Sequence, residues 1–140
     1  MKRTKYFFLS LSIILLVVIG CGLGFYIVKQ TKPQYVEGNI VITAIIDYGS
    51  LKIDNYEEHN ITILNGSTAL QVFMKVADLD IVNYTFGSYI RGVNGYKEQL
   101  PNYWAFYYFK QVSQTWYYSE VGVNAYYVQN GGKIKLAYTG

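Results

Sequence analysis

An uncharged apolar run near the amino terminus constrains this chain more than any other feature. The run covers 23 residues, 6–28, and follows the basic residues Lys2, Arg3 and Lys5. As an α-helix it would be about 34 Å long, enough to cross a hydrocarbon core of about 30 Å. The sequence therefore predicts a transmembrane anchor over 6–28, preceded by a basic cytoplasmic tail at 1–5.

Two other interpretations of the run stay open. The residues Val18-Ile19-Gly20-Cys21 resemble a bacterial lipobox, in which Cys21 would be the acylated residue. A cleaved secretory signal is the third interpretation, although its apolar core is typically about 7–15 residues and this run is longer. The basic residues before the run favour an amino terminus inside the cell. We therefore expect a single-pass protein of the cell membrane with its carboxy-terminal domain outside the cytoplasm.

The remaining residues are balanced in charge. Residues 29–140 hold nine Lys/Arg and nine Asp/Glu, so the net charge of +3 comes from the first five residues. A neutral region lacks the basic footprint of a nucleic-acid binder, so we expect no nucleic-acid partner. Cys21 is the only cysteine, and about 110 residues can form a core without disulfides. We expect a short stalk at 29–38 and one domain over 39–140.

Residue patterns predict the fold class of that domain. The stretches 39–47 and 59–64 read as strands, and Asn65-Gly66 reads as a tight turn. A helix then extends to about Leu79, because apolar residues recur on one helical face and Ser67 or Thr68 can cap it. Five further strands are expected near 81–85, 87–93, 103–110, 114–119 and 132–138. The expected fold is α+β, with one helix packed on a mixed or antiparallel sheet.

Aromatic residues concentrate in one block, 103–127, which holds eleven of them. Neighbouring strand residues point to opposite faces, so Tyr107-Tyr108 and Tyr117-Tyr118 place a ring on each face of the sheet. One face can bury its rings, and the other must meet solvent, a ligand or a partner. Tyrosine surfaces suit binding because each ring offers area and a hydroxyl. The alternative is a set of cross-strand ladders that only stabilise the sheet.

Four stretches resemble a known family when taken in order. They are Asn65-Gly66-Ser67-Thr68-Ala69-Leu70, GSYIRGVNG at 87–95, YWAF at 103–106, and EVGVNAY at 120–126 leading into GKIKL at 132–136. Over about residues 39–138 they resemble the transcobalamin-like carboxy-terminal domain, a β-grasp relative of the soluble-ligand-binding modules that occurs in many prokaryotic surface proteins. The resemblance implies a β-grasp-like domain, which in the vitamin B12 carriers covers one side of the corrinoid.

The resemblance also implies a ligand face. It would comprise Tyr103, Trp104, Phe106, the turn Gly122-Val123, and Tyr126. Trp104 has an alternative interpretation as a core residue, and Gly122 as a backbone position that needs an unusual dihedral angle. No large helical domain accompanies the match in this sequence, so cobalamin is implied only as the ligand of a half-site.

We therefore expect a noncovalent binding module that contacts a soluble ligand, a glycan or a surface protein. The alternative is a structural or interaction subunit of a cell-envelope assembly. We expect no enzyme, because residues 29–140 offer one histidine, His59, no cysteine and no catalytic motif. We expect no metal site. The sequons at Asn60, Asn65 and Asn83 suggest N-glycosylation, with ordinary turn chemistry as the alternative.

Overall fold

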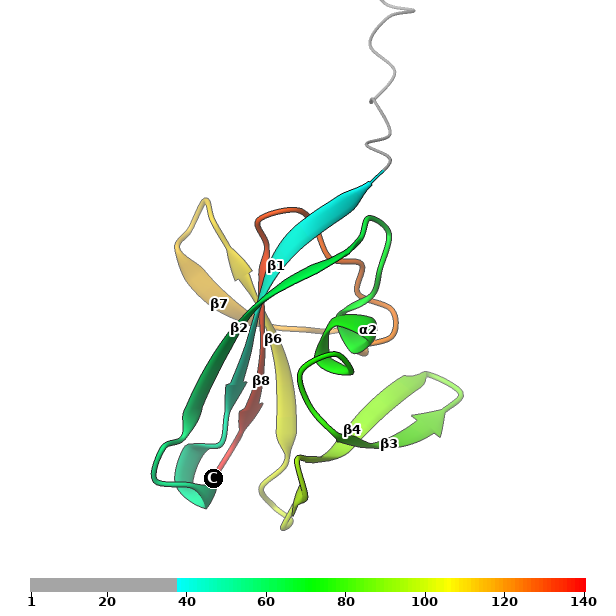
Figure 1. The fold of residues 1–140 in the computed structure, drawn as a ribbon. Helices are drawn as coiled ribbons and strands as arrows, with labels where there is room; N and C mark the ends of the chain where they lie inside the picture. The colour runs from blue at the N-terminus through cyan, green and yellow to red at the C-terminus, as the bar shows by residue number, and fades with distance from the viewer. Residues whose placement is uncertain (1–37) are drawn as a thin grey trace, which may run out of the picture. The chain divides into compact units, whose positions relative to one another are not determined.

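The computed structural model describes residues 38–140, which build two sheets and one short α-helix (Figure 1). The basic tail, the predicted anchor over 6–28, Cys21 and nearly all of the stalk lie outside the described residues and stay predictions. Between Gly38 and Gly140, no helix is long and apolar enough to span a bilayer.

The larger sheet has five strands in the order β2-β1-β8-β6-β7. The central pair β1 and β8 is parallel, and the other neighbours are antiparallel, so the sheet is mixed. A mostly sheet domain with one helix agrees with the predicted α+β class. The bounds are β1 Asn39–Asp47, β2 Tyr56–Leu64, β6 Trp104–Lys110, β7 Thr115–Tyr118 and β8 Lys133–Tyr138.

A smaller antiparallel sheet lies beside it, in the order β3-β4-β5. Its strands are β3 Leu79–Tyr84, β4 Gly87–Val93 and β5 Tyr96–Lys97, and a short 3-10 helix, Gly49–Leu51, lies between β1 and β2. The turn between β4 and β5 is Asn94-Gly95, with φ of 50° and 85°. Two successive positive φ values are what a two-residue hairpin requires, and Asn-Gly supplies them at low cost.

The core lies between the large sheet and helix α2, Ala69–Phe73. Alternate residues of β1 and β8 are buried there, as the period of two along a strand requires. Phe73 meets the ring of Phe106 edge-on from the other side, with centroids 6.1 Å apart. The residues at the centre of this core are Ile42, Ala44, Ile46, Val72, Phe73, Ile134 and Leu136.

Helix α2 begins where the sequence predicts but ends earlier than Leu79. Thr68 and Gln71 form a capping box at its start. After Phe73 the chain makes tight turns, and the Asp78 N–H then donates to the Asn94 side-chain oxygen at 2.8 Å. The Asn94 N–H donates back to the Asp78 carbonyl at 2.7 Å. This exchange draws the chain into β3, so the predicted helix to Leu79 is wrong in its length.

Candidate functional site

A cavity of about 400 Å³ lies between β4, β6 and the loop that follows β7. Its floor is apolar, since Ile90, Trp104, Phe106, Val123 and Leu136 line it and are all buried. Its margin carries Phe86, which is 82% exposed, and the exposed Val121. Exposed apolar side chains beside an apolar hollow are typical of a surface that meets a ligand or a partner.

Five of the six predicted ligand-face residues line this one cavity. They come from the start of β6 and from the loop after β7, and they are Tyr103, Trp104, Phe106, Gly122 and Val123. The sequence separates the two groups, and antiparallel pairing of β6 with β7 brings them together. Their role as ligand contacts stays a prediction, but they form one continuous surface.

Tyr126, the sixth residue, is not among the residues that line this cavity. Its ring contacts Phe106 and Tyr108 at centroid distances of 5.3 and 5.2 Å, and burial raises the pKa of its phenol. Its backbone carbonyl accepts the N–H of Ala69 at 2.8 Å, at the first turn of α2. Tyr126 therefore anchors the loop to the helix and does not line the cavity.

Gly122 is explained by a close contact and not by the unusual dihedral angle that the sequence suggested. Its φ is not in the left-handed range, so no unusual dihedral angle explains it. A Cβ at this position would lie 2.9 Å from the Asn124 side-chain oxygen and 3.4 Å from the Ser88 carbonyl. The glycine is thus a site of close approach between the loop and β4.

Asn124 holds the loop against β4 and was missed by sequence reasoning. Its side-chain oxygen accepts the Ser88 N–H at 2.9 Å. The same loop is fixed to α2, where the Leu70 N–H donates to the Val123 carbonyl at 2.9 Å. The cavity wall is therefore tied to both the small sheet and the helix. The EVGVNAY stretch contained Asn124, but sequence alone did not show which backbone it would cap.

Trp104 fits both interpretations given from sequence, since it is a core residue and also lines the predicted ligand face. It is 3% exposed, and its indole N–H donates to the Tyr96 carbonyl at 2.9 Å. Tyr48 and Tyr138 meet it edge-on, each at 5.6 Å. It is a core residue whose remaining surface forms part of the cavity floor.

One polar pair lies beside the apolar floor. The Tyr89 hydroxyl, on β4, donates a short hydrogen bond to the Glu98 carboxylate. Burial, and next the bonded carboxylate, raise the pKa of Tyr89 well above its usual value. Tyr89 is therefore a neutral donor at physiological pH, and its hydrogen bond is already used within the protein.

The other aromatic face of the sheet meets the cavity only at Tyr118, which also lines it. Tyr107 and Tyr118 are 5.7 Å apart, and Phe109 and Trp116 are 5.2 Å apart. Lys135 lies over the rings of Tyr107 and Trp116, and Lys133 lies over Phe109. The rings are thus gathered on one face as the strand alternation predicts, with lysine stems covering part of them.

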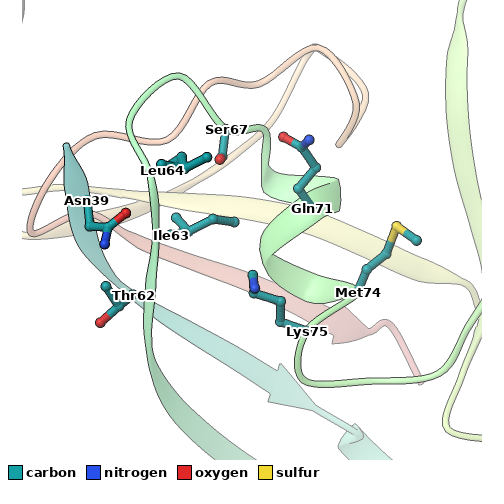
Figure 2. A pocket seen from close by; sticks show the side chains of 8 residues that line it. All are labelled: Asn39, Thr62, Ile63, Leu64, Ser67, Gln71, Met74 and Lys75. Atoms are coloured by element: carbon teal, nitrogen blue, oxygen red, sulfur yellow. The ribbon is translucent and has the colours of Figure 1, made fainter. Parts of the chain in front are cut away.

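A second hollow, of about 450 Å³, lies between β2 and α2 (Figure 2). Ile63 and Leu64 reach it from the strand, and Gln71 and Met74 from the helix and its end. None of the predicted ligand-face residues lines this pocket.

The remaining predicted positions are on strands and turns. Asn60 is in β2 and Asn83 in β3, where their side-chain oxygens accept hydrogen bonds from Thr43 and Ser88, while Asn65 is in the turn after β2. Glycosylation at these three sites stays a prediction. Within residues 38–140, His, Cys, Asp and Glu form no group of three that could hold a metal ion.

Comparison with known proteins supports the fold and leaves the family open. No family model matches the sequence, and no curated protein matches it. Among solved structures, the chain is similar to haptocorrin, solved in complex with Cbi, with a TM-score of 0.60 and 19% identity. The match covers 78% of this chain and 27% of the haptocorrin chain, so this chain spans about a quarter of that length.

A second similar structure is a protein from Ruminococcus gnavus ATCC 29149, provisionally described as metal-binding. It has a TM-score of 0.49 and 13% identity, over 71% of this chain and 96% of that one. The likeness to haptocorrin, at 19% identity, shows a shared fold alone, and the chemistry of the site has to come from the residues.

Proposed function

We propose that the chain is a membrane-tethered, noncovalent binding module whose cavity between β4, β6 and the loop after β7 holds an apolar part of a soluble ligand. One observation carries the proposal: five residues implied by the resemblance line a single cavity with exposed apolar residues at its margin. The likeness of the fold to haptocorrin, solved with Cbi, supports a corrinoid as the first ligand class to test.

The topology supports a β-grasp relative. A hairpin β1-β2, a helix, and a last strand parallel to β1 in the centre of the sheet are the arrangement that the resemblance implies. The cavity is open on one side, so it is a half-site. A ligand held only by this chain would keep much of its surface in water, and we expect weak binding unless another body covers it.

Equilibrium dialysis of the full chain in detergent against cobinamide tests the proposal. Phe86→Ala should lower the affinity about five- to tenfold, because truncating an exposed ring that packs on a ligand costs roughly 1–1.5 kcal/mol. Val112→Ala is the matched control, since Val112 is a fully exposed apolar residue that does not line the cavity. If both variants lose the same affinity for cobinamide, or if both bind it as well as the parent chain, the proposed site is wrong.

The second candidate is an interaction subunit of an envelope assembly. It rests on β2, which is nine residues long and an edge strand of the large sheet as the described residues show it. An unpaired edge offers backbone groups to another strand. Crosslinking in native membranes that finds a partner at β2 would favour this candidate, and recovery of monomer alone would count against it.

A further inference from the structure

One end of the large sheet, here named the proximal end, gathers four segments that are far apart in sequence (Figure 1). It is the end at which β1 begins, and Asn39 pairs there with Leu64. Lys133 lies beside Thr43 on the parallel strand β8. Because β6 is antiparallel to β8, Lys110 and the turn 111–114 lie at this end as well.

Charge is distributed unevenly between the two ends. The segments that build the proximal end are 39–43, 61–68, 110–116 and 127–133, and they hold Lys110 and Lys133 but no Asp or Glu. The opposite, distal end is built around the β1–β2 connection and holds four acids, Asp47, Asp54, Glu57 and Glu58, against one base, Lys52, which pairs with Glu57 at 2.9 Å. The domain therefore presents a positive end and a negative end along the strand direction.

The proximal end also exposes apolar and aromatic side chains. Val112, at the tip of the β6–β7 turn, is fully exposed, and Leu64 is 66% exposed. Tyr117 and Tyr127 are exposed near the same tips. Lys110 lies over the Tyr117 ring at 4.3 Å. Lysine beside tyrosine and a few apolar tips is the combination found where proteins meet the headgroup region of a bilayer.

We propose that the proximal end docks on an anionic lipid surface, with Lys110 and Lys133 contacting headgroup phosphates and Val112 and Leu64 entering the interface. This rests on the anchor that the proposed function includes. Only residues 29–38 separate the predicted anchor from β1, and ten extended residues reach about 35 Å at most. Such a short tether keeps this end close to the membrane at a high effective concentration.

Docking would orient the cavity. Trp104 and Phe106 lie at the start of β6, whereas Lys110 is its last residue and belongs to the proximal end. A domain resting on its proximal end therefore presents the cavity margin away from the lipid. The open side of the cavity would then face away from the membrane, where a soluble ligand or a second protein could reach it.

The test uses the full chain, produced without glycosylation, in vesicles of phosphatidylcholine with or without phosphatidylglycerol. A nitrobenzoxadiazole label is placed at Val112→Cys or, as the matched control, at Ile53→Cys at the distal end. Both side chains are fully exposed, so neither change removes core packing. Cys21 is left in place, and the labelled parent chain supplies the background. Lipids spin-labelled at the headgroup then quench a label that reaches the interface.

We expect quenching several-fold stronger at position 112 than at 53, and only in anionic vesicles. Lys133→Gln should lower the docked-to-free ratio about fivefold, since a lysine near an anionic surface contributes roughly 1 kcal/mol. Lys97→Gln, in the small sheet, should leave the ratio unchanged. Equal quenching at both positions in vesicles that retain the chain would overturn the docking and leave the anchor and the cavity intact. Loss of the chain from the vesicles would overturn the anchor and the docking together.

Discussion

The side-chain oxygen of Asn124 accepts the backbone N–H of Ser88 at 2.9 Å, across 36 residues of sequence. The bond joins the loop after β7 to the start of β4, and both segments line the cavity. This bond, the bond from the Leu70 N–H to the Val123 carbonyl and the close packing of Gly122 fix the cavity wall in place. Such preorganisation lowers the entropy cost of binding.

Replacing Asn124 with Ala should lower the free energy of unfolding by about 0.5–1.5 kcal/mol, because the exposed Ser88 N–H then exchanges its protein acceptor for water. It should also weaken any ligand bound in the cavity, since the loop is then less fixed. Urea unfolding and dialysis measure the two effects. Gln129→Ala, an exposed amide further along the same connection, is the control, and an equal effect of both variants would contradict the role of Asn124.

Gly122→Ala should destabilise the domain by about 1–3 kcal/mol, because the new methyl group overpacks the contact between loop and strand. Its nearest neighbour would be the Asn124 oxygen at 2.9 Å. Adding Asn124→Ala removes that atom, so the double variant should cost less than the sum of the two single variants. If the losses in unfolding free energy of the two single variants simply add in the double variant, the close approach of position 122 to Asn124 is unimportant.

Alkaline pH should destabilise the domain through Tyr89. Its pKa is raised above the ordinary value near 10 by burial and by the Glu98 carboxylate. The folded state holds this proton more tightly than the unfolded chain, so stability is complete below about pH 10 and falls as the pH rises further. Tyr89→Phe should flatten this fall, measured by urea unfolding across that range. The exposed Tyr127→Phe is the control, and identical slopes in the two variants would refute the assignment.

Thr68→Ala should cost about 1 kcal/mol, because it removes the side chain that caps α2. The Thr68 hydroxyl accepts the Gln71 N–H, and Gln71 accepts the Thr68 N–H at 2.8 Å. Thr68→Ser keeps the hydroxyl and should keep most of the stability. Circular dichroism during thermal unfolding separates the variants, and equal midpoints for Ala and Ser would contradict the cap.

The strand pattern could be predicted because it depends on local features. The β-branched, largely apolar run at 39–47 and the Asn94-Gly95 turn correspond closely to the structure. The order of the strands was not evident from those patterns. The parallel pairing of β1 with β8 joins segments about ninety residues apart, and only packing of the whole core selects it.

The helix shows where local reasoning fails. Leu70, Phe73 and Ala77 lie on one helical face, yet α2 ends at Phe73. After tight turns the backbone of Asp78 pairs with Asn94, which lies sixteen residues beyond Asp78 in the sequence. The candidate site likewise depends on contacts that local sequence patterns do not reveal. Trp104 and Gly122 were selected by resemblance, but the close approach at Gly122 and the wall contact made by Asn124 depend on β4, which pattern alone did not place beside the loop.

Amide hydrogen exchange of the full chain, with and without saturating cobinamide, tests the binding cavity most directly. Ligand in the cavity should slow exchange in the segments that line it, residues 86–90 and 119–125, and leave exchange unchanged in the β6–β7 turn at 111–114. Unchanged exchange in both segments, or protection confined to the turn, would contradict binding in the cavity.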